Sequence, residues 1–274
     1  MQGGMSMFYN AKNGVLALDG TTMNYLSFGR GKRNLIMIPG LGDGLKTVKG
    51  MAIPFALMYA MFAKDFTVYV FSRKNELPQG YTIRDIALDV KKGMDMLGIK
   101  KADILGVSQG GMIAQHLAID FPERVGKLVL TVTIGRQNPC IQECISKWVE
   151  LAKENRFGEV MKDVTLRMYT SEYIEKYRFM VPLLGLYPAP KNKERFVIMA
   201  ESCISHDAYD KLSQITAPTL IIGGERDETV SGEASRELAE QIKGSELYMY
   251  QEYGHGLYSE AADFNQRVLE FLLR

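Results

Sequence analysis

Ser108 lies at the centre of Gly106-Val-Ser-Gln-Gly110, a G-x-S-x-G pattern. A serine flanked in this way can occupy the tip of a sharp turn between a strand and a helix, where its hydroxyl is exposed for attack on a carbonyl carbon. The two glycines remove side chains that would block such a turn. We therefore predict that Ser108 is the nucleophile of an acyl-transfer reaction.

A serine hydroxyl needs a general base to become nucleophilic, and the chain contains three histidines. His255 stands between two glycines in a predicted loop before the last helix, so its ring can approach Ser108. His116 falls within the helix that follows Ser108 and is predicted to pack there or face the surface. His206 is predicted to cap a helix or lie on its surface, with a place in the pocket wall as the alternative. We predict His255 as the base.

An acid should fix the tautomer of the base and stabilise its charged form. Three acidic residues follow the apolar run at 219–222, namely Glu225, Asp227 and Glu228. Asp227 lies deepest in this turn, and the chain order of serine, aspartate and histidine is the one expected after a G-x-S-x-G turn. Asp227 is therefore predicted to orient His255, and the two glutamates are predicted to be surface charges.

The negative oxygen that forms during acyl transfer needs two N–H donors. One is predicted to be the backbone amide of Gln109, directly after the nucleophile. The second is predicted in the glycine-rich stretch 39–44, with Leu41 as the best candidate. No G-K-[ST] follows these glycines, which argues against a phosphate-binding loop. Neither a cofactor nor a metal ion is predicted.

The elements that must position these residues alternate along the chain. Short apolar runs predict strands and amphipathic stretches predict helices, which is typical of a mostly parallel sheet covered by helices on both faces. The α/β core is predicted over 1–134 and 211–274. The strands are expected at 35–38, 66–71, 102–107, 127–132, 219–222 and 246–250, after a hairpin over 15–28, and the main helices at 82–97, 109–120, 233–242 and 262–273.

The alternation stops between residues 135 and 210, where helical patterns rich in aromatic residues and methionines follow one another. We predict a helical lid over the carboxyl ends of the strands, because ligands bind at those ends. A set of plain surface helices is the alternative. The methionines of this segment and of 51–58 indicate an apolar pocket.

With these residues the chain resembles the α/β-hydrolase superfamily over nearly its whole length, and its capped esterases, lactonases and C–C-bond hydrolases look most similar. The similarity is carried by 106–110, 121–125, 215–223 and 254–256. It implies an α/β-hydrolase fold with a lid. Pro39-Gly40 stands where the family commonly has His-Gly, which leaves the backbone donor. Ser72 to Pro78 replaces the family's Asp-x-Arg-Gly-x-Gly loop, so a different pocket wall is expected.

The predicted reaction is hydrolysis of a small, largely apolar ester, thioester or lactone through an acyl-enzyme on Ser108. Dehalogenases and epoxide hydrolases of this fold use an aspartate nucleophile, and the serine argues against both. Three alternatives stay open. The triad could serve an acyltransferase or perhydrolase, it could cleave amides or C–C bonds, or the fold could be a ligand receptor without catalysis.

Composition sets outer limits on the partners. The chain has 274 residues with 33 basic against 32 acidic side chains, so no global charge favours nucleic acid. No apolar run is long enough to span a bilayer, and residues 1–10 lack the features of a secretory signal. Cys140, Cys144 and Cys203 are expected to be reduced, which favours the cytoplasm. Exposed aromatics of the lid are compatible with a homodimer.

Overall fold

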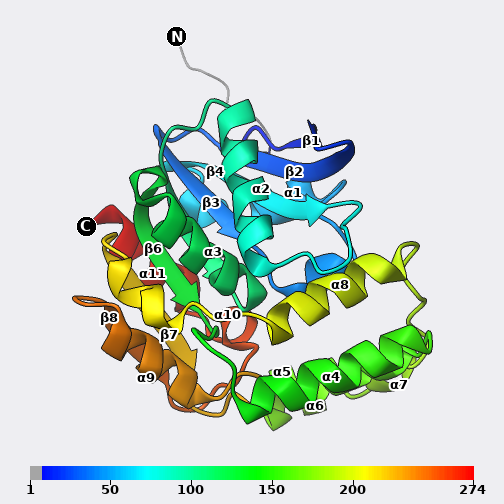
Figure 1. Ribbon diagram of the computed structural model, residues 1–274. Helices are drawn as coiled ribbons and strands as arrows, with labels where there is room; N and C mark the ends of the chain where they lie inside the picture. Colours follow the sequence, from blue (N-terminus) through cyan, green and yellow to red (C-terminus); the bar gives the residue numbers. More distant parts are fainter. Residues whose placement is uncertain (1–7) are drawn as a thin grey trace.

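The computed structural model describes residues 8–274; residues 1–7, part of the stretch in which no signal is predicted, lie outside the described residues. One eight-stranded sheet has the order β1-β2-β4-β3-β5-β6-β7-β8. The strands from β3 to β8 pair in parallel, while β1 and β2 form the predicted hairpin and pair antiparallel. The mostly parallel sheet is therefore confirmed (Figure 1). The strands are β1 (Lys12–Leu18), β2 (Thr21–Gly29), β3 (Arg33–Ile38), β4 (Phe66–Lys74), β5 (Ala102–Val107), β6 (Val125–Thr131), β7 (Thr219–Gly224) and β8 (Glu246–Tyr250).

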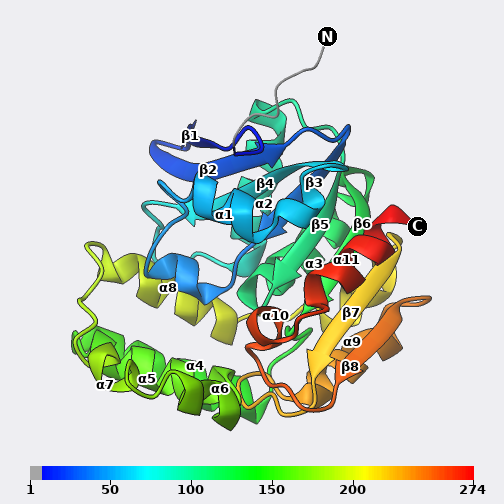
Figure 2. The same cartoon turned by 180° about the vertical axis from the view of Figure 1, so that it is seen from behind.

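Helices cover both faces of the sheet, because the central strands β3, β5, β6 and β7 are buried on both sides. Neighbouring residues of β3 show the alternation: Ile36 belongs to the core cluster under one set of helices, and Leu35 to the cluster under the other. Figures 1 and 2 show the two layers from opposite sides. The first set is α2 (Ile83–Met96), α3 (Gln109–Asp120) and α9 (Gly232–Gln241), and the second is α1 (Ala52–Met58), α10 (Leu257–Glu260) and α11 (Phe264–Leu273).

Local sequence signals fix the ends of the core helices. Thr82 caps α2 by accepting a hydrogen bond from the amide of Asp85, and the Asp85 side chain accepts one from the amide of Thr82 in return. This reciprocal pair satisfies two backbone donors that the first turn would otherwise leave free. Helix α3 stops before Pro122, as the proline predicts.

Five helices lie between β6 and β7, where the insertion is predicted. In Figures 1 and 2, α4 to α7 form a separate layer beyond the carboxyl ends of the strands, and α8 lies between that layer and the sheet. Helix α8 packs against α4 and against the short 3-10 helix η1 (Leu41–Gly44) that follows β3. The five helices are α4 (Pro139–Lys153), α5 (Phe157–Met168), α6 (Ser171–Lys176), α7 (Val181–Leu184) and α8 (Lys193–Ile204).

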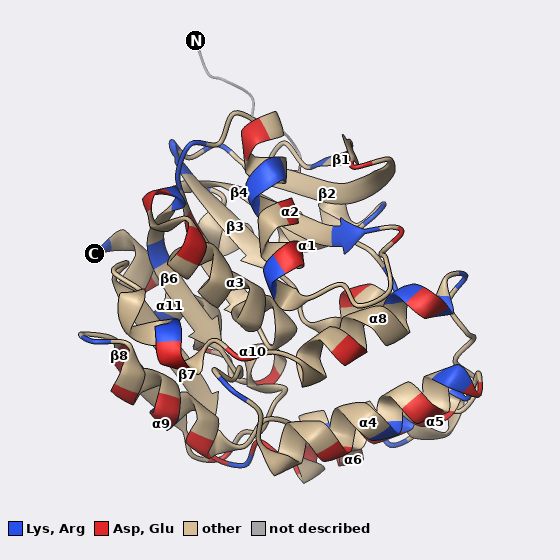
Figure 3. Cartoon of the chain, in the orientation of Figure 1, with Lys and Arg blue, Asp and Glu red and all other residues tan. Residues whose placement is uncertain are grey.

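Among residues 8–274, every helix is too short or too polar to cross a lipid bilayer. Acidic and basic side chains are interspersed along α4, α8 and α9 (Figure 3). This mixing agrees with the nearly balanced charge of the whole sequence.

Candidate active site

Ser108 sits on a strained turn between β5 and α3. Its backbone has φ 54° and ψ −120°, a conformation that costs a residue with a side chain free energy. The turn is possible because the neighbouring glycines leave room: a Cβ on Gly110 would lie 1.9 Å from the carbonyl oxygen of Ile38, and one on Gly106 would lie 2.5 Å from that of Gly110. The glycines of the motif are thus required by close backbone approach.

The structure brings Ser108, His255 and Asp227 into one hydrogen-bonded chain. Nε2 of His255 is 3.0 Å from Oγ of Ser108, and Nδ1 is 2.8 Å from Oδ2 of Asp227. The other carboxylate oxygen of Asp227 accepts hydrogen bonds from the amides of Thr229 and Val230, at 2.8 and 2.9 Å. Both His255 and Asp227 are buried. A carboxylate held in this way can keep a proton on Nδ1 and leave Nε2 free to accept the serine proton.

The loop that carries His255 is held by the end of α5. The amide of Gly256 donates to the carbonyl oxygen of Met168 at 2.7 Å. A Cβ on Gly256 would lie 2.7 Å from the ring of Tyr169, so only glycine fits at this contact. Thr170 adds a hydrogen bond from its hydroxyl to the carboxylate of Glu260 at 2.6 Å. The inserted helices therefore support the position of His255.

The two predicted oxyanion donors each occupy the first position of a helix. Leu41 opens η1 and Gln109 opens α3. The N–H groups of a first helical turn have no acceptor inside their own helix, so these amides are available to a ligand. Gly40, directly before Leu41, lies close to the nucleophile: a Cβ on it would stand 3.3 Å from that of Ser108.

A cavity of about 480 Å³ opens beside Ser108 and His255. Its walls are mainly apolar and come from both the sheet side and the inserted helices, which fits the apolar pocket predicted from the methionines. Residues 72–78 are absent from the described lining, and the first three of them belong to β4, which runs on to Lys74. The lining residues include Leu41, Leu45, Met51, Phe55, Tyr59, Met112, Ile141, Ile145, Trp148, Met161, Val164, Met168, Tyr169, Phe196 and Tyr258.

The remaining acidic and sulfur candidates make no contact with the hydrogen-bonded triad, although Cys203 lines the cavity. Glu225 forms an ion pair with Arg236 and is exposed, as is Glu228. All three cysteines are free. Burial raises the pKa of Cys144 to about 11 and that of Cys203 to about 12, so neither is a thiolate at neutral pH. Within residues 8–274 no three His, Cys, Asp or Glu side chains are grouped so that they could hold a metal ion.

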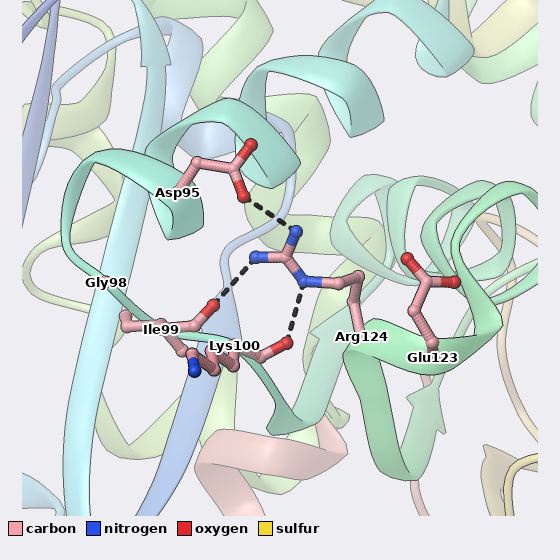
Figure 4. Close-up of a pocket in the computed structure, with 6 residues that line it drawn as sticks. All are labelled: Asp95, Gly98, Ile99, Lys100, Glu123 and Arg124. Carbon is pink, nitrogen blue, oxygen red and sulfur yellow. Dashed lines mark hydrogen bonds and ion pairs between the residues drawn. The ribbon is translucent and has the colours of Figure 1, made fainter.

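A second hollow lies at the other end of the sheet, between α2 and β6 (Figure 4). Arg124 occupies it and already donates to the carboxylate of Asp95 and to the carbonyl oxygens of Ile99 and Lys100, at 2.7 to 2.8 Å. With its donors used inside the protein, this arginine is a structural tie between elements.

His116 and His206 form a buried pair away from Ser108. Their rings meet edge to face with centroids 5.3 Å apart, and Nε2 of His206 is 3.2 Å from the carbonyl oxygen of Ile134. His206 is not part of the described cavity lining, and it follows α8 without capping it. The cap, the surface position and the pocket-wall position considered for His206 from the sequence are therefore wrong, because its ring is buried in the core against His116 of α3.

This burial predicts an acid-sensitive stability. Burial lowers the pKa of His206 to about 3, so the folded protein leaves it neutral while the unfolded chain protonates it below about pH 6.5. The unfolded state then binds more protons, and the free energy of unfolding falls as pH drops from 6.5 towards 3, by up to about 1.4 kcal/mol per pH unit. Urea midpoints at pH 7 and pH 4.5 should differ less in His206→Gln than in the wild type. Equal differences in both proteins would contradict this account.

Sequence reasoning missed three buried charged residues near the oxyanion amides. Asp43 lies in η1, Arg73 at the end of β4 and Arg195 on α8, and the Arg195 guanidinium contacts the Asp43 carboxylate at 2.5 Å. The one available signal was the polar run Ser72-Arg-Lys74 directly after an apolar strand.

Comparison with known proteins places this geometry in a family. The model of the alpha/beta hydrolase fold family matches residues 33–262. The 2-hydroxy-6-oxononadienedioate/2-hydroxy-6-oxononatrienedioate hydrolase of Klebsiella pneumoniae is 29% identical, over 93% of this chain and 97% of that protein. The enol-lactonase of Burkholderia xenovorans LB400 superposes with a TM-score of 0.81 at 24% identity, covering 95% of this chain and all of that one. An esterase of Exiguobacterium antarcticum superposes with a TM-score of 0.74 at 20% identity, covering 95% of this chain and 98% of that one. The chain belongs to the alpha/beta hydrolase family of enzymes.

Proposed function

We propose that this enzyme is a serine hydrolase that cleaves a small, largely apolar carboxylic ester or lactone through an acyl-enzyme on Ser108. The observation that carries the proposal is the hydrogen-bonded chain from Ser108 through His255 to Asp227, which begins at the wall of an apolar cavity. A serine with a base in reach, and a base with an orienting carboxylate, is the arrangement that activates a hydroxyl.

The reaction follows from these positions in two halves. Oγ of Ser108 attacks the carbonyl carbon while its proton moves to Nε2 of His255, and the amides of Leu41 and Gln109 stabilise the oxyanion. The tetrahedral adduct then collapses, and His255 gives the proton to the departing alcohol oxygen. Water attacks the acyl-enzyme with His255 again as base. Ser108 leaves with that proton, and the carboxylic acid is released.

The charges around the cavity favour an uncharged substrate. Of the charged groups in its described lining, Asp43 is held by Arg195, which leaves the exposed Lys46 as the cation open to a ligand. The Klebsiella relative is named for a substrate with two carboxylates. Burying a carboxylate without a partner is costly, so a dianion of that kind fits this cavity poorly.

The inserted helices α4 to α8 act in this proposal as the lid, with the core formed by residues 1–134 and 211–274. Trp148, Met161 and Phe196 from these helices line the cavity opposite the sheet. A lid in this position excludes water from the oxyanion during the reaction and limits the size of the acyl group.

The apolar walls predict a dependence on acyl chain length. Each methylene buried in such a pocket is worth about 0.8 kcal/mol, so kcat/KM for p-nitrophenyl esters should rise about fourfold per added CH2 from acetate to butyrate. The rise should stop once the acyl chain fills the cavity of about 480 Å³. Initial rates for a homologous ester series measure this, and a flat or falling series from the first member would contradict the assigned pocket.

A substrate panel tests the proposed reaction. Neutral esters, thioesters, lactones, amides and the dienedioate of the Klebsiella relative are incubated with the enzyme and with Ser108→Ala. Neutral esters or lactones should be turned over by the wild type alone. Hydrolysis confined to the dienedioate would favour C–C-bond cleavage, products formed only with added alcohol or peroxide would favour an acyltransferase or perhydrolase, and binding without turnover would favour a receptor.

A further inference from the structure

Four buried polar side chains form one cluster next to the two segments that carry the predicted oxyanion amides of Leu41 and Gln109. The cluster consists of Asp43 on η1, Arg73 on β4, Gln109 on α3 and Arg195 on α8, and each is at most 4% exposed. Only Asp43 is in the described cavity lining, so the two guanidinium groups lie behind the site. We call these four residues the arginine cluster.

Arg73 connects the two segments that carry the oxyanion amides. Its Nη2 donates to the carbonyl oxygen of Pro39, two residues before Leu41, and to the side-chain oxygen of Gln109 at 3.0 Å. Its own backbone amide donates to the carboxylate of Asp43 at 2.9 Å, two residues after Leu41. One residue thus holds the Leu41 loop from both sides and ties it to Gln109.

Helix α8 completes the cluster from the side of the lid. Arg195 donates from Nη2 to the carboxylate of Asp43 at 2.5 Å and from Nε to the carbonyl oxygen of Lys74 at 2.8 Å. The side-chain amide of Gln109 donates to the carbonyl oxygen of Met199 at 2.7 Å. Both oxyanion segments are therefore fastened to the same lid helix.

The cluster carries more positive than negative charge. It holds two guanidinium groups and one carboxylate, that of Asp43, which forms its ion pair with Arg195. Nε and Nη1 of Arg73 have no acceptor among the described residues. Burial lowers the pKa of Arg73 to about 10 against the raising effect of Asp43, so the group stays charged at neutral pH. A buried excess charge costs stability, and well-packed apolar residues would serve the fold better.

We propose that Arg73 is a positioning residue for the oxyanion hole. It fixes the Leu41 loop against Gln109, and its excess positive charge lies behind the amides where negative charge develops. Both effects are larger in the transition state than with bound substrate, so the residue acts on kcat more than on KM. This inference rests on the proposed function, because it needs the oxyanion that forms when Ser108 attacks a carbonyl group.

The test combines kinetics with a transition-state analogue. Arg73→Met removes the shared donor and leaves Asp43 paired with Arg195. Gln109→Met cuts the same connection without touching a charge and keeps the amide of residue 109. For p-nitrophenyl butyrate, kcat should fall about 10- to 100-fold, below the loss seen when an oxyanion donor is removed outright, with KM within about twofold. The inhibition constant of butylboronic acid, which forms a tetrahedral adduct on serine, should rise by a similar factor.

Arg124→Met is the matched control, because the Arg124 side chain makes three internal hydrogen bonds, against two for Arg73, but lies at the far end of the sheet (Figure 4). It should lower Tm and leave kcat and the butylboronic acid constant unchanged. Arg73→Lys, which keeps the charge and can make one of the contacts, should recover part of kcat.

The outcomes separate the two claims. Unchanged kcat and boronate affinity in the folded Arg73→Met and Gln109→Met enzymes would overturn this inference alone. It would also be overturned if the loss of activity in Arg73→Met and Gln109→Met matched only the fraction of unfolded enzyme, as expected for Arg124→Met. If wild-type enzyme neither hydrolyses the butyrate ester nor reacts with a fluorophosphonate at Ser108, the proposed function fails and this inference fails with it.

Discussion

Ser108→Ala is expected to lower kcat for ester hydrolysis by about 10⁶-fold, while Tm stays within a few degrees of the wild type. In the proposed reaction the hydroxyl oxygen forms the acyl-enzyme, and it lies 3.0 Å from Nε2 of His255, which takes its proton. Residual turnover should come from water in a site whose oxyanion amides are intact. Steady-state rates of p-nitrophenyl butyrate hydrolysis by the wild type and the variant measure the fall in kcat.

The matched control is Ser205→Ala, because Ser205 is exposed at the end of α8 and distant in sequence from the turn at Ser108. It should keep the full rate. A Ser108→Ala enzyme that retained more than about one per cent of wild-type kcat would contradict the assignment of the nucleophile, since the loss expected for a triad serine is orders of magnitude larger.

Asp227→Asn is expected to lower kcat by about 10⁴-fold. The asparagine can occupy the same space, and its oxygen can still accept hydrogen bonds from the amides of Thr229 and Val230, which lie 2.8 and 2.9 Å from Oδ1 of Asp227. It supplies no negative charge to stabilise protonated His255, and its NH2 group can hold the ring in the wrong tautomer. KM should change little, because Asp227 is absent from the described cavity lining.

Glu228→Gln is the control for this variant, since it removes a neighbouring carboxylate that is exposed to solvent. It should retain wild-type kcat, and so should Glu225→Gln. If either glutamate variant lost more activity than Asp227→Asn, the acid of the triad would have been assigned to the wrong residue of this turn.

The sequence predicted the strands and the triad because each depends on local patterns. A buried strand is a short apolar run. The turn at Ser108 needs glycines at fixed distances from the serine, because Gly110 approaches the backbone of Ile38 closely. The turn at Asp227 and the glycine-flanked His255 follow β7 and β8 in the same local way. Parallel strands then bring their carboxyl ends together, so three distant residues meet.

The arginine cluster could not be predicted, because nothing local marks it. Asp43 and Arg195 are 152 positions apart in the sequence, and Arg73 and Gln109 are 36 positions apart. Polar side chains on η1, β4 and α8 give no period or motif, and only the way α8 packs on η1 buries them together. The same holds for His206, whose position after a predicted helix gave no sign that its ring enters the core beside His116.

The acyl-enzyme itself provides the most direct test. The enzyme is mixed with excess p-nitrophenyl butyrate, quenched in acid within milliseconds, digested and analysed by mass spectrometry. The account predicts a butyryl group on the peptide that contains Ser108, formed in the burst phase and absent from Ser108→Ala. Turnover without any adduct, or a butyryl group carried by another residue, would contradict it.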